Sequence, residues 1–385
     1  MRRTIFTEDH DDFRDSVRTF FEKEAVPFFE QWEKQGHPDK SFYRKAGEMG
    51  LLGLQVPEEY GGGGMESFKF SAILIEEAAR LGVSLGGMRV HTDLILPYLT
   101  SNGTEEQLRR WLPGYADGSL MFAIAMTEPG TGSDLAGIRT TAKLSDDGQH
   151  YILNGSKTFI TGGYNADRVL VVCRTSPAPA ENRRLGLSIL VVDTSLPGYS
   201  VGRTLDKMGQ KASDTAELFF EDVPVPVADL LGEEGQGFFY LGQNLAQERL
   251  TIAVGAVAAA GAAIDHAKAY TQQRRVFGQP VAAFQNTKFV LAECQADYTA
   301  GQAMLDQALE LHDHGELTPQ DAAALKLWTT EMQGRVIDKC LQLHGGYGYM
   351  NEYPIAKLYT DARVSRIYGG TSEVMKTIIA KGMGL

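Results

Sequence analysis

The chain has 385 residues, of which 43% are hydrophobic and 22% charged, and its formal net charge is -12. This length exceeds one simple core, so we expect a soluble globular protein of two or three domains. The acidic balance argues against non-specific nucleic-acid binding, which depends on Lys and Arg at phosphates. A local basic pocket for a phosphate-bearing ligand is still compatible with it.

Cysteine usage and the N-terminus favour a cytoplasmic protein. The sequence has three cysteines, Cys173, Cys294 and Cys340. Their number is odd, their neighbours are apolar and their spacing is not that of metal ligands, so we expect buried thiols in a reducing compartment. The N-terminal MRRTIFTEDHDDFRD has two arginines but lacks the apolar run of a secretory signal. The apolar stretch 252–264 is too short to span a bilayer, so we expect no membrane association.

Residues 1–120 predict an N-terminal helical domain. The segment 11–34 has apolar residues at helical spacing, namely Phe13, Val17, Phe20, Phe21 and Phe28. Further helices are predicted over 41–50, 67–82 and 104–118, with Thr104 as the N-cap of the last.

Residues 121–235 change to short β-branched and aromatic runs divided by Gly, Pro and Asp-Gly signals. We expect strands within 120–129, 150–161, 167–175, 185–194, 199–203 and 215–226. The simplest interpretation is a small middle β-barrel or a sandwich.

Residues 236–385 are helical again, with predicted helices over 238–273, 284–314, 318–343 and 371–381. Four antiparallel helices with short connections form a bundle. The predicted fold class is therefore a multidomain α+β chain with an N-terminal helical domain, a middle β-barrel and a C-terminal four-helix bundle.

Several familiar catalytic and nucleotide-binding motifs are absent from the sequence. No G-x-G-x-x-G links a strand to a helix, and there is no Walker A, H-E-x-x-H or G-x-S-x-G sequence. The histidines show no metal-ligand spacing, so we expect no metal site. Any dinucleotide must therefore bind through other devices.

Five segments could carry chemistry: MTEPGTGSD, KTFITGG, QQRRVFGQPVAAFQ, LQLHGGYGYMNEYP and RIYGGTSEVMKTII. The first two end strands with Thr, Ser and Gly, whose hydroxyl and backbone N–H groups can face a flat polar ring. Taken singly, each also has a structural explanation as a surface turn, a helix C-terminus, a helix stop or a helix cap.

Together and in this order, TEPGTGSD, KTFIT, RRVFG, LHGGYGY and YGGTSEV resemble the motifs of the acyl-CoA dehydrogenase family along nearly the whole chain. The resemblance implies the same three-domain fold and an FAD enzyme. Family members form a trans-2-enoyl thioester from an acyl-CoA and pass electrons to an electron-transfer flavoprotein. They are usually homotetramers with the FAD site at a subunit interface.

The resemblance also implies roles for individual residues. The FAD-binding set would be Met126, Thr127, Ser133, Phe159, Ile160, Thr161, Arg274, Phe277, Gln285, Gln342, Gly345, Gly346, Thr371 and Glu373. Many members have Trp where Phe159 stands, and Phe lacks the indole donor. Arg274, which would come from a neighbouring subunit, suits a pyrophosphate because its guanidinium is a fork of donors.

The catalytic base departs from the commonest family pattern. Many members have Glu directly after the Tyr of the terminal motif, but here Gly369 follows Tyr368. The isovaleryl-CoA and long-chain branches instead have Glu before Arg on the bundle helix, as Glu248 and Arg249 stand here. We therefore expect Glu248 to be the base, made stronger by desolvation. Ser133, Arg249, Tyr368 and Gly369 would bind substrate.

Several alternatives stay open. The same fold also serves acyl-CoA oxidases and flavin monooxygenases, and a degenerate member could bind a thioester without turnover. An acyl carrier protein could replace coenzyme A. The acyl chain is undetermined: Gly86 and Gly87 would permit a long or branched chain, and Arg89 or His91 could meet a polar acyl end.

Overall fold

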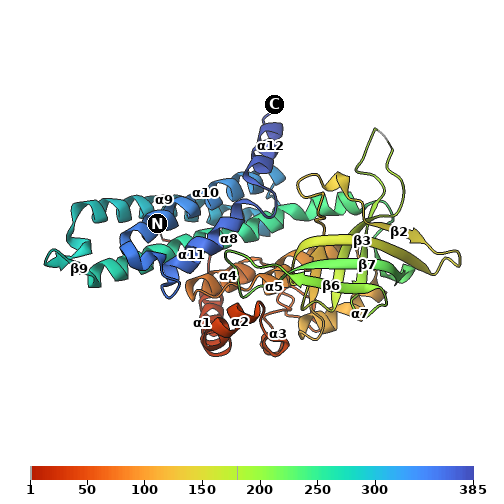
Figure 1. The fold of residues 1–385 in the computed structure, drawn as a ribbon, viewed down its shortest axis with the longest axis horizontal. Coiled ribbons are helices and arrows are strands. Elements are labelled where there is room, and N and C mark those ends of the chain that lie inside the picture. The colour runs from red at the N-terminus through yellow and green to blue at the C-terminus, as the bar shows by residue number, and fades with distance from the viewer. Residues whose placement is uncertain (1, 180) are drawn as a thin grey trace.

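The computed structural model describes residues 2–179 and 181–385, with helices before and after one main β-sheet in the sequence (Figure 1). The sheet lies toward one end of an elongated molecule, and the C-terminal helices extend to the other. One helix, α8 (Gly237–Gln273), runs along this length and joins the two ends. The predicted order of helical, sheet and helical domains is confirmed.

The N-terminal region contains α1 (Glu8–Glu24), α2 (Phe29–Gln35), α3 (Lys40–Glu48), α4 (Lys69–Arg80) and α7 (Glu105–Ala116). The prediction of one helix over 11–34 is wrong. Pro27 lies in a 3-10 turn between α1 and α2, because it cannot donate the N–H that a helix interior needs. Phe28 is consequently 42% exposed and Phe29 is buried. Thr104 caps α7 as predicted, accepting from the Gln107 N–H.

A helical segment that the sequence analysis did not delimit connects α4 to α7. It comprises α5 (Gly86–Arg89), a π-helix (Val90–Ile95) and α6 (Leu96–Asn102). Its Gly-Gly and Pro residues are typical of breaks, yet Pro97 fits the first turn of α6, where no N–H is needed. π-Helical turns are rare and occur often at functional sites.

The main sheet has the strand order β6-β7-β3-β2-β4-β5-β8, with β1 paired to β4. Its strands are β1 (Phe122–Ala125), β2 (Thr141–Leu144), β3 (His150–Thr161), β4 (Arg168–Arg174), β5 (Leu187–Asp193), β6 (Tyr199–Thr204), β7 (Thr215–Pro226) and β8 (Leu230–Leu231). The sequence predicted all of them except β2 and β8, which are too short to show alternation.

The sheet separates two apolar cores. One contains Ala123, Val171 and Leu218 with other strand residues. The other joins alternate residues of β4 and β5 to α6, α7 and Leu241 of α8. Because successive side chains of a strand point to opposite faces, neighbouring residues such as Leu170 and Val171 enter different cores. This packing fixes the start of α8 against the sheet.

The C-terminal region is built from α8, α9 (Gln285–Asp313) and α10 (Pro319–His344). A two-stranded hairpin, β9 (Arg275–Val276) and β10 (Gln279–Pro280), follows α8. Shorter helices α11 (Pro354–Ala362) and α12 (Ser372–Gly382) pack on α10, and α4 packs on α8. Their shared core includes Cys294 and Cys340; these and Cys173 are free, buried thiols, as predicted.

α8 is long and apolar enough, by length and composition, to cross a membrane. It extends well beyond the apolar stretch that the sequence analysis judged too short. However, 67% of its most apolar window is buried inside the protein, and the core helix of a soluble protein meets the same criterion. This feature is therefore weak evidence for a membrane association.

Candidate active site

A cavity of about 360 Å³ lies where the sheet, the π-helix, α8 and the segment before α12 meet. The surface of the cavity is mainly apolar, although polar and charged side chains are at least as numerous along its wall as apolar ones. The lining residues include Ile124, Phe159, Thr161, Ser213, Glu248, Ile252, Tyr368 and Gly369. The cavity thus brings together predicted residues from three distant parts of the chain.

Glu248 is the carboxylate of this cavity. It lies on α8 and is only 5% exposed. The hydroxyl of Tyr98, on α6, donates to its Oε1 at 3.0 Å. Burial raises the pKa of Glu248 to about 7, although the Tyr98 hydrogen bond and the charge of Arg249 oppose the rise. A carboxylate in this state can accept a proton near neutral pH.

Arg249 lies beside Glu248 in the chain and is 4% exposed, but it is not among the described residues that line the cavity. Its Nε has no hydrogen-bond partner in the described part of the chain. Its charge acts on Glu248 and on Lys326 of α10; burial lowers the pKa of Lys326 to about 8, and Arg249 adds to this. Lys326 donates to the Gly370 carbonyl, which holds the segment around Gly369.

Gly369 faces the cavity at a φ of +61°. A Cβ atom at this position would come within 2.4 Å of Ile252 Cδ1, and Ile252 lies one helical turn after Glu248. The backbone and its neighbour are therefore both adapted to glycine. A side chain at 369 would strain the backbone and would force the Ile252 Cδ1 methyl to move.

The end of β3 supplies one wall of the cavity. Phe159 is 64% exposed with a φ of +61°, an uncommon conformation for a large residue. Thr161 also lines the cavity, whereas Ile160 points into the sheet core, so only its backbone is left for a ligand. On the loop before β7, Ser213 Oγ is buried and has no partner among the described residues.

The loop after β1 is held by a buried ion pair. Lys157 donates to Glu128 Oε1 and to the Met126 carbonyl, both at 2.9 Å. Met126 and Thr127 are half-buried next to this pair. Ser133 is exposed farther along the loop and is not among the described residues that line the cavity.

A second group of predicted cofactor residues lies at the far end of α8. Arg274 follows the last residue of α8 and stands over the Tyr347 ring, 5.5 Å from its centroid. Arg274, Gly345 and Gly346 line one open depression. Phe277 is 95% exposed, and Gln285 and Gln342 are also exposed. At a rise of about 1.5 Å per residue, the end of α8 beside Arg274 is about 40 Å from Glu248 along the helix.

The start of α12 holds the last two predicted cofactor residues. Thr371 is the N-cap, and its hydroxyl accepts from the Val374 N–H. Glu373 is exposed in the first turn. Both lie directly after the Tyr368–Gly370 segment and thus near the catalytic cavity.

Three family models match the chain in order: the N-terminal domain of acyl-CoA dehydrogenase over residues 7–119, the middle domain over 123–223 and the C-terminal domain over 235–384. The mitochondrial long-chain specific acyl-CoA dehydrogenase of Rattus norvegicus is 46% identical over 379 residues, covering 98% of this chain and 87% of that protein. The chain belongs to the acyl-CoA dehydrogenase family.

Solved structures of the acyl-CoA dehydrogenase family agree. The enzyme from Geobacillus kaustophilus has a TM-score of 0.96 and 48% identity, covering 99% of each chain. An acyl-CoA dehydrogenase from Bacillus anthracis, solved in complex with FAD, has a TM-score of 0.91 and 32% identity, covering 98% of this chain and 67% of that chain. The chain is thus an acyl-CoA dehydrogenase by sequence and fold.

Some residues of this acyl-CoA dehydrogenase site were not found from the sequence. Tyr98 contacts Glu248 from a helix whose bounds were not predicted, and nothing in the sequence singled out this tyrosine. Lys326 was identifiable in principle, because it is an isolated charge within the apolar run AAALKLW. His91, a candidate for a polar acyl end, is fully buried and its Nδ1 accepts from the Phe122 N–H, so it has a structural role.

The raised pKa of Glu248 predicts a pH-dependent stability. Its folded-state pKa of about 7 exceeds its ordinary 4.5, so the folded chain binds the proton more tightly than the unfolded chain. This contribution is complete below about pH 4.5 and is lost as pH rises through 7, a difference of roughly 3 kcal/mol at 1.36 kcal/mol per pKa unit.

We therefore expect Glu248→Gln to be about as stable as wild type near pH 5 and more stable by roughly 3 kcal/mol at pH 8. Urea unfolding of both proteins, at equal FAD content and protein concentration, measures the difference. Equal stability at both pH values would show that Glu248 is not a desolvated acid.

Proposed function

We propose that this acyl-CoA dehydrogenase uses FAD to form a trans-2-enoyl thioester from an acyl-CoA, with Glu248 as the base that removes the α-proton. One observation supports this most strongly. The buried carboxylate of Glu248 faces the same cavity as Gly369, whose positive φ and contact with Ile252 disfavour a side chain. The cavity thus has a carboxylate with a raised pKa at one position and a glycine at the other.

The cavity fits the flavin ring of FAD. Phe159 presents an exposed aromatic face at the end of β3, suited to packing on a planar ring. Thr161 and Thr215 add hydroxyl groups, and the unpartnered Ser213 Oγ is available to a polar ring edge. When bound, FAD supplies the acceptor for the β-hydride.

The chain's own residues would orient the thioester and move one proton. Apolar side chains such as Ile124 and Ile252 exclude water from the reacting carbons. Glu248 Oε1 accepts the hydrogen bond from Tyr98, which holds the carboxylate in one orientation. Its other oxygen is then available to receive the α-proton.

Two subunits would complete each FAD site. Arg274, Gly345 and Gly346 form a group suited to a pyrophosphate and adenosine, but one rigid helix separates them from Glu248 by about 40 Å. FAD cannot reach both groups of one chain. We therefore propose a homo-oligomer, a tetramer by resemblance, in which Arg274 serves a neighbour's cavity.

This arrangement predicts complementation between two defective chains. Glu248→Gln lacks the base and Arg274→Gln lacks the phosphate contact, so each alone is expected to be inactive or short of FAD. In mixed oligomers, a cavity with Glu248 can receive Arg274 from the other variant. Co-expression should recover about a quarter of wild-type activity in a random mixture, and up to about half in mixed pairs selected through two affinity tags. Activity no higher than that of the two separate variants would show that Arg274 acts within its own chain.

The substrate is proposed to be a medium or long acyl-CoA. A second cavity of about 310 Å³ adjoins the catalytic cavity and gives room for a chain beyond the reacting carbons. Gly86, which lines both cavities, packs so closely on the Ser213 hydroxyl that a Cβ would be 2.5 Å away. The related rat enzyme is named for long-chain substrates. Electrons would pass to an electron-transfer flavoprotein.

The direct test is anaerobic titration of the purified FAD-loaded protein with acyl-CoAs from butyryl to palmitoyl. We expect the flavin absorbance to bleach with at least one medium or long chain. A protein that keeps FAD but does not bleach with any member would disprove the proposal. Re-oxidation by an electron-transfer flavoprotein much faster than by air would separate a dehydrogenase from an oxidase.

A further inference from the structure

The second cavity is a continuation of the catalytic cavity with an unusual residue in its wall. The two cavities share Gly86, Arg89, Gln210, Ile252 and Tyr368. Apolar side chains from α4, including Leu74 and Ile75, cover much of the remaining wall, as expected for a hydrocarbon chain. Several charged and polar side chains also line it, and among them Arg89 is the charged residue that lines both cavities.

The hydrogen bonds of Arg89 use only part of its donor capacity. Its Nη2 donates to the Thr251 carbonyl at 2.6 Å and to the Thr251 hydroxyl at 3.2 Å. Its Nε is buried and has no partner in the described part of the chain. A buried N–H without a partner is unfavourable, so the described residues leave the hydrogen-bonding capacity of this guanidinium unfilled.

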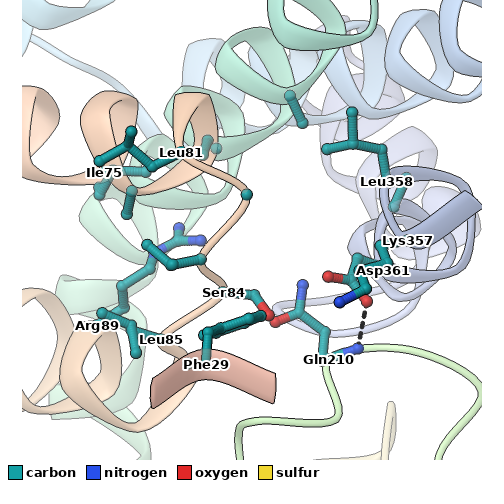
Figure 2. Close-up of a pocket in the computed structure, with 18 of the residues that line it drawn as sticks. Phe29, Ile75, Leu81, Ser84, Leu85, Arg89, Gln210, Lys357, Leu358 and Asp361 are labelled. Atoms are coloured by element: carbon teal, nitrogen blue, oxygen red, sulfur yellow. Dashed lines mark hydrogen bonds between the residues drawn. The ribbon is translucent and has the colours of Figure 1, made fainter. Parts of the chain in front are cut away.

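The charge of Arg89 already has a counter-charge. The hydroxyl of Thr251 donates at 2.6 Å to the buried carboxylate of Asp93. Burial raises the pKa of Asp93, and the charge of Arg89 opposes this rise. Across the cavity, Asp361 is a second carboxylate, as Figure 2 shows. Besides Asp361, the wall has two more carboxylates, Glu30 and Glu352, and its second cation, Lys357, is paired with Glu33. Carboxylates therefore outnumber cations around the cavity, so a further negative charge would meet repulsion, whereas a neutral acceptor would not.

The position of Arg89 sets how far along an acyl chain it acts. Its Nη1 is 3.0 Å from where a Cβ of Gly255 would stand. Gly255 is seven residues after Glu248 on α8, or about 10 Å by helix rise. At roughly 1.5 Å per bond, this distance corresponds to about seven bonds beyond the α-carbon.

We propose that Arg89 is a specificity residue that binds a neutral oxygen, of a keto or hydroxyl group, on the distal part of the acyl chain. This inference rests on the proposed acyl-CoA dehydrogenase function. The guanidinium offers its unused N–H donors to the oxygen, while Asp93 and Thr251 hold it in place. The preferred substrates are then oxygenated acyl thioesters rather than plain hydrocarbon chains or ω-carboxylates.

The test uses FAD-loaded enzyme and three matched pairs: octanoyl-, decanoyl- and dodecanoyl-CoA, each beside its analogue with a keto group on the penultimate carbon. For at least one pair we expect kcat/KM to favour the keto analogue about tenfold, equivalent to about 1.4 kcal/mol. The dissociation constants of the same pair on Glu248→Gln should show the same preference without turnover.

Variants locate the effect. Arg89→Met, which keeps a similar length without donors, should abolish or reverse the ratio, and Arg89→Lys should keep part of it. Arg80→Met makes the same change at an exposed residue of α4 and should keep the full ratio. FAD content and Tm report whether each variant is folded, and the ratio within one protein cancels any loss of active enzyme.

Three results would overturn the proposal: equal kcat/KM within every pair in wild type, an unchanged ratio in Arg89→Met, or a preference for decanedioyl-CoA over the keto analogue. In each, bleaching by plain acyl-CoA leaves the dehydrogenase function standing. If no thioester bleaches the flavin, the proposed function itself fails, and this inference fails with it.

Discussion

Replacing Glu248 with Gln is expected to slow flavin reduction by acyl-CoA roughly a thousandfold, within the range that a positioned general base contributes. Gln has nearly the same shape and can still accept the hydrogen bond from Tyr98, so the cavity should keep its form. It cannot take the α-proton. Stopped-flow absorbance under anaerobic conditions, with FAD content measured in parallel, gives the rate.

The pH profile provides a second signature of the same residue. Burial raises the pKa of Glu248 to about 7, and only its ionised form can act as a base, so the wild-type rate should increase as pH rises through 7. The residual rate of Glu248→Gln should lack this step. Glu106→Gln, an exposed neutralisation on α7, serves as control and should behave as wild type. Equal bleaching by Glu248→Gln and wild type would place the base elsewhere.

Moving the carboxylate to the other position is expected to fail. In Gly369→Glu the new Cβ would lie 2.4 Å from Ile252 Cδ1, and the residue would have a φ of +61°. Overpacking costs about 1–3 kcal/mol and a left-handed non-glycine residue about 1–2 kcal/mol. We therefore expect a loss of roughly 3 kcal/mol of stability and no recovery of activity in the Glu248→Gln/Gly369→Glu double variant.

Matched alanine variants separate the two causes. Gly61 also has a positive φ, +87°, but a Cβ there has no atom within 4 Å, so Gly61→Ala measures backbone strain alone. Gly369→Ala should be clearly less stable than Gly61→Ala in thermal unfolding. Adding Ile252→Ala should recover part of the difference, because the next atom, Lys326 Cε, is 3.7 Å away. Equal losses for the two glycines would rule out the clash.

The elements with strong periodicity were predictable from the sequence alone. The limits of β3 and β7 match the predicted runs 150–161 and 215–226, since alternation and turn residues mark both ends. The segment 86–102 was not delimited, because Gly-Gly and Pro conceal a helix that tertiary packing stabilises. At Pro27 the error is the opposite one. The apolar periodicity continues across this residue and predicts one helix, but α1 ends before it and Pro27 lies in a 3-10 turn.

The site shows a similar division. Glu248 could be singled out through the family resemblance, which links its presence to the lack of a carboxylate at Gly369. Tyr98, Thr251 and Asp93 carry no such signal. Their roles come from contacts between elements far apart in the chain, and a sequence shows the residues but not which of them meet.

The length of α8 has a consequence for assembly. In the proposed oligomer, one helix separates Glu248 from the residues around Arg274, so a lone subunit would have two incomplete ligand sites. Oligomerisation and cofactor affinity are then linked by mass action. Dilution that separates subunits should release FAD, and added FAD should hold subunits together. FAD would then stabilise the quaternary structure in addition to accepting electrons.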